Sequence, residues 1–239
     1  MTELEERLLR ENWLRVQEEV HQACVQARRD PDSVKIVGVT KYVDAHTTLC
    51  LARAGCTALG ENRPQLLWQK HQHFAEQGAT EDVQWHMIGH LQRNKIRRTL
   101  QCKPIIHSID SERLLEAISK ESAAQQFVTD VLLEVNISGD SDKTGMTKEQ
   151  ILQLIENHLD TGVRVRGLMA MAGWGTDVES ARNHFEQTRE LRDQLETRFG
   201  IALPELSMGM SGDFPAAIAA GATLVRIGSR LFQGILDRD

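Results

Sequence analysis

The sequence has few of the features that mark membrane-bound or secreted proteins. No apolar run approaches the ~20 residues that a membrane-spanning helix needs, and the acidic N-terminus lacks the basic-then-apolar pattern of a signal peptide. There are only four cysteines, and none of them forms a Cys-x-x-Cys pair. This usage excludes a disulfide scaffold, and we expect a cytoplasmic protein with reduced thiols and no membrane association.

Linker-type composition is also absent, because the five prolines are scattered and no Pro/Ser/Gly-rich segment divides the 239 residues. With 41% hydrophobic and 26% charged residues, the chain is typical of a globular protein, and we expect one domain. The charge balance is only mildly acidic, with 34 acidic and 28 basic residues and a formal net charge of −6. Dedicated nucleic-acid binders usually have a basic surface, so we expect no nucleic-acid partner.

The chain alternates short β-branched runs with longer helical patterns. An amphipathic helix comes first, and Thr2 with Glu5 forms a capping box at its start. Eight runs of strand character follow, at Val34–Thr40, Cys56–Leu59, Trp85–Ile88, Pro104–Ile109, Phe127–Ile137, Val163–Leu168, Glu205–Gly209 and Thr223–Ile227. Helical patterns follow the first four of these runs at 47–54, 64–76, 92–100 and 111–125. A helix follows the fifth run after a capping box of Thr147 with Gln150. A long helix follows the sixth run, with a cap of Thr176 with Glu179 at its start and Phe199 at its end.

Regular alternation of strands and helices predicts a parallel sheet. Eight such units in ~250 residues predict a single-domain α/β fold, the (β/α)8 TIM barrel, over residues 1–239, with residues 1–30 as an extra N-terminal helix packed on the barrel. The alternative is an open, doubly wound sheet. The count of eight units and the lack of a Gly-x-Gly-x-x-Gly turn after the first strand both disfavour it.

In a barrel the reactive groups lie at the carboxyl ends of the strands. Lys41 closes the first strand directly after the apolar run 36–40. Loss of hydration there favours the neutral amine, which can form a Schiff base with a carbonyl group. The alternative is a lysine that extends its ammonium group into solvent at a strand end.

Small residues and hydroxyl groups follow the seventh and eighth strands, where barrels often bind phosphate. Ser211 comes after the seventh strand, and Gly228 and Ser229 come after the eighth. These residues offer hydroxyl and backbone N–H groups to an anion, although Ser211 and Ser229 could instead be ordinary helix N-caps. Within the eighth strand, Arg226 either points inward toward a ring nitrogen or carboxylate, or points outward under a helix.

His86 and His90 have the i, i+4 spacing of a metal-binding pair. That spacing brings two side chains together only on a helix, and here it spans a strand end and Gly89. We therefore predict no metal-ligating residues.

A lysine able to form a Schiff base next to a phosphate site suggests pyridoxal 5'-phosphate (PLP) as the cofactor. Seven segments resemble, in order, those of the pyridoxal phosphate homeostasis protein family, also called the YggS or PROSC family. They are Val39–Lys41, Gly60–Asn62, Ile88–Lys95, Glu134–Ser138, Arg166–Met169, Leu206–Ser211 and Val225–Gly228. The resemblance covers roughly residues 34 to 234, and its most specific parts are 88–92 and 207–211.

The resemblance implies a barrel like the N-terminal domain of fold-type III PLP enzymes such as alanine racemase. It implies PLP held as an aldimine on Lys41, with the phosphate on Ser211, Gly228 and Ser229. Arg226 is then near the pyridine nitrogen, and Asn62 and His90 line the other side of the cofactor. The implied role is to hold and buffer PLP in vitamin B6 and amino-acid homeostasis and to supply apo-forms of PLP-dependent enzymes, with no robust catalytic turnover, hence no catalytic residues. We expect a monomer.

Two segments depart from the family pattern. Arg63-Pro64 stands where the family usually has tyrosine and another residue, and the segment Met171–Gly175 differs from a loop that usually contains proline. Both departures concern the rim of the expected pocket.

The main alternative is a PLP-dependent amino-acid racemase of fold type III. Arg226 argues against it, because a permanently charged arginine disfavours the protonated pyridine that makes PLP a strong electron sink. Racemisation also needs a proton-transferring group on each face of the substrate carbon. Tyr42, the sole tyrosine, points to the opposite side from Lys41 if the first strand continues, and no residues are left for a second domain.

A third reading is a phosphate-binding barrel that uses Lys41 on a sugar aldehyde. Such a site needs an acid–base relay beside the lysine, and Glu61 and Asp110 are the candidates.

Overall fold

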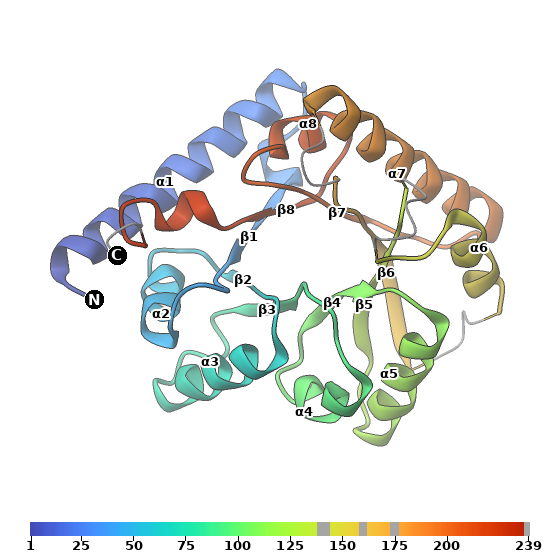
Figure 1. Ribbon diagram of the computed structural model, residues 1–239, viewed down its shortest axis with the longest axis horizontal. Helices are drawn as coiled ribbons and strands as arrows, with labels where there is room; N and C mark the ends of the chain where they lie inside the picture. The colour runs from blue at the N-terminus through green and yellow to red at the C-terminus, as the bar shows by residue number, and fades with distance from the viewer. Residues whose placement is uncertain (138–143, 158–161, 173–176, 237–239) are drawn as a thin grey trace.

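Eight parallel strands pair in chain order, and the last pairs with the first, so that they close into a barrel in the computed structural model (Figure 1). The structure describes residues 1–137, 144–157, 162–172 and 177–236. The strands are β1 (Lys35–Val39), β2 (Ala58–Glu61), β3 (Gln84–Met87), β4 (Ile105–Ile109), β5 (Thr129–Glu134), β6 (Val163–Met169), β7 (Glu205–Met210) and β8 (Leu224–Ile227). The pairing of β1 with β8, from Lys35 opposite Leu224 to Gly38 opposite Ile227, closes the barrel. The predicted (β/α)8 fold is therefore confirmed.

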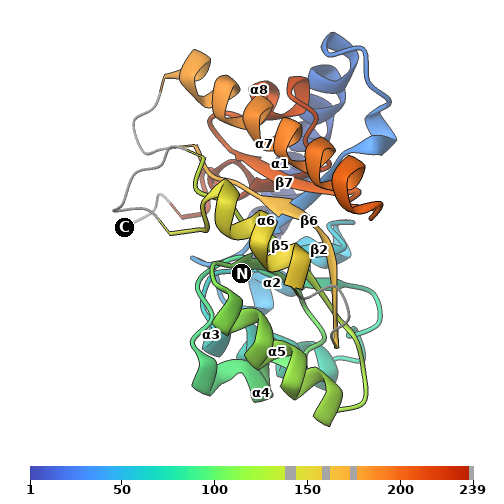
Figure 2. The same ribbon diagram turned by 90° about the vertical axis from the view of Figure 1, so that its right-hand side faces the viewer.

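Helices form a ring outside the strands (Figures 1 and 2). They are α2 (Ala45–Arg53), α3 (Pro64–Glu76), α4 (Ile96–Leu100), α5 (Glu112–Ala124), α6 (Lys148–Asn157), α7 (Val178–Phe199) and α8 (Phe214–Ala219). The predicted helix 92–100 is divided into a 3-10 turn, η2 (Arg93–Lys95), and the short α4, and another 3-10 turn, η3 (Ser229–Phe232), follows β8. No helix in the described part of the chain is long and apolar enough to cross a membrane.

The predicted N-terminal helix is present as α1 (Glu3–Gln26), which lies beside α8 and η3 on the outside of the barrel (Figure 1). Its capping box of Thr2 with Glu5 forms as predicted. Its inward face buries Leu9, Trp13 and Val16. A short 3-10 turn, η1 (Pro31–Ser33), leads from this helix into β1.

Several boundaries differ from the sequence-based prediction. Asp44 caps α2, so this helix begins two residues earlier than expected. The strand β5 is shorter than the run 127–137, and β2 lies two residues later than the run 56–59. The predicted cap of Thr176 with Glu179 is wrong, because the carboxylate of Asp177 accepts from the Ser180 N–H at 2.9 Å and starts α7 at Val178. Thr176 itself lies outside the described residues. The capping box of Thr147 with Gln150 is confirmed.

The strand register decides which side chains enter the barrel. One small apolar cluster fills part of the lumen: Val37, Ala58, Leu132, Met169 and Leu224. The larger apolar core lies between the strands and the helices. Because neighbouring residues in a parallel pair share a face, Arg226 opposite Val37 and His86 opposite Gly60 also point into the lumen. The lumen is thus partly polar, and its polar groups must satisfy one another.

Candidate functional site

Lys41 lies at the carboxyl end of the barrel, in the turn that follows β1, and is half-buried. Its Nζ lies 4.7 Å from the centre of the Tyr42 ring. The expectation that Tyr42 points away from Lys41 is therefore wrong. Strand β1 ends at Val39, so the alternation of side chains along a strand does not extend to residues 41 and 42.

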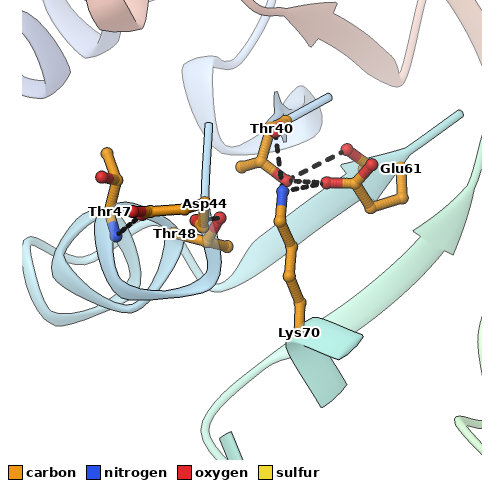
Figure 3. Close-up of polar contacts among 7 residues, drawn as sticks. Thr40, Asp44, Thr47, Thr48, Glu61 and Lys70 are labelled. Atoms are coloured by element: carbon orange, nitrogen blue, oxygen red, sulfur yellow. Dashed lines mark hydrogen bonds and ion pairs between the residues drawn. The ribbon is translucent and has the colours of Figure 1, made fainter. Parts of the chain in front are cut away.

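The residue before Lys41 is held by a buried ion pair (Figure 3). Lys70, on α3, pairs with Glu61 at the end of β2, and its Nζ also donates to the backbone oxygen of Thr40 at 2.7 Å. The Thr40 hydroxyl donates to Glu61 Oε1 at 2.6 Å. Lys70 is 2% exposed and Glu61 is fully buried. Both the backbone and the side chain of Thr40 are thereby fixed, and with them the start of the turn that carries Lys41.

The other end of that turn is fixed by the start of α2. Asp44 accepts from the Thr47 N–H at 2.7 Å, and the Thr48 hydroxyl donates to the Asp44 backbone oxygen at the same distance (Figure 3). Inside the turn, the Val43 N–H donates to the Thr40 oxygen at 3.1 Å. Lys41 therefore sits on a short segment that is anchored on both sides.

Lys70 was not among the residues singled out from the sequence. The signal was present, because Lys70 occupies the inward face of α3 between Leu67 and Phe74, at spacings of three and four. Burial lowers the pKa of Lys70, and the charge of Glu61 opposes that shift. Glu61 Oε1 accepts from Lys70 and from the Thr40 hydroxyl, while Glu61 Oε2 is buried and has no hydrogen-bond partner among the described residues.

The segments after β7 and β8 lie side by side. The Gly228 N–H donates to the Ser211 hydroxyl at 3.2 Å, and Gly228 lies against Val39 at the end of β1. Neither serine acts as a helix cap: Asp213 precedes α8, and Gly228 precedes η3. The alternative reading of Ser211 and Ser229 as ordinary N-caps is therefore wrong.

Arg230 braces these segments from outside. Its Nε donates to the Ser211 backbone oxygen at 2.8 Å, and its Nη1 pairs with Glu19 of α1 at 2.6 Å. No local pattern in the sequence indicates this link, since Glu19 and Arg230 are 211 residues apart. Through it, the N-terminal helix supports the segment that carries Ser211.

Arg226 points into the lumen, so the reading with an outward side chain is wrong. Its Nη1 donates to the backbone oxygen and the hydroxyl of Ser207, at 2.7 and 2.6 Å, and its Nη2 donates to the Ala170 oxygen at 3.0 Å. Burial lowers the pKa of Arg226 to about 10, so the side chain stays charged at neutral pH. Three of its five N–H groups are used, which leaves Nε and one Nη2 hydrogen for a further acceptor.

Two buried histidines extend the polar chain that starts at Arg226. His107 Nδ1 lies 2.8 Å from Ser207 Oγ, and His107 Nε2 lies 2.8 Å from His86 Nδ1. Burial lowers the pKa of His86 to about 3, and that of His107 falls well below its ordinary value for the same reason. Because arginine only donates, we assign the Ser207 proton to His107 and the His107 Nε2 proton to His86.

Asn62 and His90 follow β2 and β3 at the carboxyl end of the barrel. His90 is exposed, and its Nδ1 lies 3.0 Å from Asp110 Oδ2. It does not converge with His86, which points into the lumen from β3. Asn62 Oδ1 is buried and has no hydrogen-bond partner among the described residues. The backbone of Asn62 packs closely on Gly89, because a Cβ at residue 89 would lie 2.3 Å from the Asn62 backbone oxygen.

A small cavity of about 190 Å³ opens beside Asn62 and His90. Its other lining residues are Arg63, Pro64, Gln65, Gln92 and Lys95. Arg63 and Pro64 therefore lie on the rim of this cavity, and their place on the rim of a cofactor pocket stays a prediction. Of the second departure, Met171 is exposed, and residues 173–175 lie outside the described residues.

Comparisons with known proteins place this geometry among relatives. Residues 8–235 match the alanine racemase N-terminal domain family. The chain is 38% identical over 223 residues to the pyridoxal phosphate homeostasis protein of Aquifex aeolicus, covering 93% of this chain and 96% of that protein. It is 36% identical over 206 residues to the protein of the same name from Vibrio alginolyticus, covering 85% and 88%.

Solved structures agree with this relationship. PipY of Synechococcus elongatus, with PLP bound, is 30% identical with a TM-score of 0.79, over 89% of this chain and 99% of PipY. A protein of unknown function from Bifidobacterium adolescentis is 32% identical with a TM-score of 0.91, over 97% of both chains. An alanine racemase from Clostridium difficile is 14% identical with a TM-score of 0.69, covering 93% of this chain and 56% of the racemase, which shows a shared fold only.

Lys70→Met is expected to destabilise the protein by about 3–5 kcal/mol, because it leaves the carboxylate of Glu61 buried and unpaired. The double variant Lys70→Met, Glu61→Gln removes both charges and should recover part of that loss. Urea unfolding measures both values, and Lys148→Met, at an exposed position, should change stability by no more than about 0.5 kcal/mol. Equal stability of the Lys70→Met variant and the wild-type protein would contradict the role of the pair.

His86 and His107 should make the protein acid-sensitive. Both are neutral when folded and bind a proton once unfolded, so the stability they contribute is complete above pH ~6.5 and is lost as the pH falls toward the folded values, with that of His86 about 3. Each contributes a slope of about 1.4 kcal/mol per pH unit in this range. Denaturant unfolding between pH 7 and 4.5 measures how the free energy of unfolding depends on pH. In His86→Gln this dependence should be weaker than in the wild-type protein by about 1.4 kcal/mol per pH unit. The exposed control His90→Gln should keep the wild-type slope.

Proposed function

Since the chain belongs to the pyridoxal phosphate homeostasis protein family, we propose that it binds PLP at the carboxyl end of its barrel, attached to Lys41, and buffers the cofactor for other enzymes. The observation that carries the proposal is the juxtaposition of Lys41 with the segment 228–229, which offers hydroxyl and N–H donors to an anion. Strand β1 pairs with β8, and Gly228 packs on Val39. The lysine and the residues 228–229 therefore leave neighbouring strands at the same end of the barrel.

The residues present fit PLP in three respects. The Ser229 hydroxyl has no partner among the described residues, and the first N–H groups of the turn η3 are free of intrahelical bonds, so both can donate to a phosphate. Arg226 retains two N–H groups for the pyridine nitrogen. Asn62 Oδ1 is a buried acceptor in need of a donor, beside His90 on the remaining side.

When bound, PLP would supply an aldehyde carbon that a lysine amine can attack, and Lys41 is the residue that would hold it. The protein's part is to present and orient the amine. The ion pair of Lys70 with Glu61 holds Thr40, and the capped start of α2 holds Asp44, so Lys41 reaches the site from a fixed backbone. The two serines and Gly228 orient the phosphate.

Arg226 favours a binder over a racemase. Its hydrogen bonds to Ser207 and Ala170 keep a charged guanidinium in the lumen. Facing the pyridine nitrogen, this charge opposes ring protonation and weakens the electron sink that carbanion chemistry needs. Tyr42 lies beside Lys41 rather than away from it, so the orientation of Tyr42 does not disfavour racemisation, whereas the charge of Arg226 does.

The proposal extends to partners and setting. A protein that buffers PLP gives it up to apo-forms of PLP-dependent enzymes, and we propose that this one does so as a monomer in the cytoplasm. The four cysteines, all of them free thiols, support a reducing compartment.

Borohydride reduction of the PLP-loaded protein should fix the label on Lys41, since this lysine alone follows β1 at the anion site. Peptide mapping locates the label. Lys41→Ala should remove it, while Lys35→Ala, at the opposite end of β1, should keep it. A label on Lys70 or Lys95 would refute the assignment.

The double variant Ser211→Ala, Ser229→Ala should release PLP faster than the wild-type protein. Each donor to a charged oxygen contributes about 1.5–3 kcal/mol, so each loss should cost roughly ten- to hundred-fold in affinity. The assay follows transfer of PLP to an excess of an apo-enzyme, because a covalent bond masks weaker binding in the initial spectrum. Ser33→Ala, on η1 away from the site, is the control, and equal release rates in all three proteins would count against the site.

The PLP-loaded protein should not racemise free amino acids at an appreciable rate, because Arg226 weakens the cofactor as an electron sink. Chiral analysis of a panel of L-amino acids over several hours measures this, with Lys41→Ala as the blank. Turnover that depends on Lys41 and exceeds roughly one per second, the lower end of ordinary enzymes, would establish the racemase instead.

A further inference from the structure

Three side chains with metal-binding chemistry converge on the outside of the barrel, between α1 and α2. Glu6 comes from α1, and His46 and Cys50 come from α2. Cys50 Sγ lies 3.8 Å from Glu6 Oε1 and 3.9 Å from His46 Nε2, and the three ligand atoms lie within 4.8 Å of one another. None of these residues belongs to the proposed PLP site.

His46 and Cys50 lie four residues apart on a helix, which brings their side chains together, whereas His86 and His90 have the same spacing without a helix. Positions four apart lie on one face only in a helix, and α2 is helical from Ala45 to Arg53. His46 and Cys50 therefore project together, toward α1, which packs against α2. Glu6 completes the group from a segment forty residues away in the chain.

The distances approach those of a tetrahedral site. With Zn–S near 2.3 Å and Zn–N or Zn–O near 2.0 Å, the edges from sulfur to its neighbours are about 3.5 Å. The two sulfur edges observed exceed this value by a few tenths of an ångström. The side chains of Glu6 and His46 are exposed, so small rotations can close the third edge. One coordination position then faces solvent.

We propose that Glu6, His46 and Cys50 bind one divalent transition-metal ion of the Zn²⁺ type, which ties α1 to α2. A thiolate, an imidazole and a carboxylate form the donor set that such ions select over Mg²⁺ or Ca²⁺. Binding forms three coordinate bonds from the protein, and the Cys50 thiol gives its proton to solvent as the S–metal bond forms, with no change in oxidation state. This proposal departs from the sequence-based prediction of no metal-ligating residues, which considered only His86 and His90.

Co²⁺ titration of the chelator-treated protein tests the site directly. We expect one equivalent to bind, with a sulfur-to-cobalt charge-transfer band and the visible bands of tetrahedral Co²⁺. Cys50→Ser should abolish the charge-transfer band, and His46→Gln and Glu6→Gln should each weaken binding by at least ~10-fold. The matched controls His21→Gln and Glu3→Gln, both exposed on α1, should titrate like the wild-type protein. No sulfur band at stoichiometric Co²⁺, or a band that survives in Cys50→Ser, would overturn the proposal.

Thiol reactivity gives a second readout, with Zn²⁺ in place of Co²⁺. Cys24, Cys56 and Cys102 are buried and only Cys50 is partly exposed, so rapid alkylation reports on Cys50. Zn²⁺ should slow this reaction at least ~10-fold while Mg²⁺ leaves it unchanged, and Zn²⁺ at about 100 times its Kd should raise the melting temperature by ~5–10 °C. An alkylation rate that Zn²⁺ does not alter would refute metal binding.

The outcome of the metal-binding experiments can be distinguished from that of the PLP-binding experiments. Lys41→Ala should retain the Co²⁺ spectrum and the effect of Zn²⁺ on alkylation, because Lys41 is not a ligand. Loss of the metal signals in Lys41→Ala would show that the ion binds through the PLP site and would contradict the proposal.

Discussion

The buried ion pair of Lys70 with Glu61 is the interaction on which the candidate site depends. It joins α3 to the end of β2, and both members bond to Thr40, one at the backbone and one at the hydroxyl. A lysine and a glutamate without solvent are costly unless each satisfies the other. The pair is therefore best explained by what it holds, which is the residue before Lys41. A covalent cofactor site needs an amine at a defined position. Because a lysine side chain is flexible, its amine has a defined position only when the backbone that carries it is fixed.

A second polar system, inside the lumen, sets the chemistry that the site favours. Arg226 uses three N–H groups on Ser207 and Ala170, and the histidines at 107 and 86 complete the chain. Their neutral state keeps two further positive charges away from the guanidinium. One fixed positive charge thus remains at the barrel end, where it would oppose protonation of a basic ring nitrogen placed against it.

The sequence predicted the barrel because each strand carries its own local pattern, and it placed Lys41, Ser211 and Gly228 at one end of the barrel because the carboxyl ends of parallel strands meet there. The features that the sequence did not predict depend on contacts between residues that are far apart in the chain. Lys70 carried a local signal on the apolar face of α3, but its partners come from two strands. The link from Glu19 to Arg230 and the chain of histidines had no local signal. The error on Tyr42 came from extending the rule of alternation beyond Val39, where the strand ends.

The N-terminal helix is part of the site's support and not an appendage. Glu19 of α1 holds Arg230, which holds the backbone of Ser211. Thirteen residues earlier on the same helix, about 20 Å away along its axis, Glu6 reaches His46 and Cys50 on α2. The helix α2 starts at Ala45, just after the turn that carries Lys41. A single helix is therefore linked both to the segment that carries Ser211, through Arg230, and to the helix that follows the Lys41 turn. Because one helix makes both links, α1 holds these two parts of the barrel end in a fixed relation to each other.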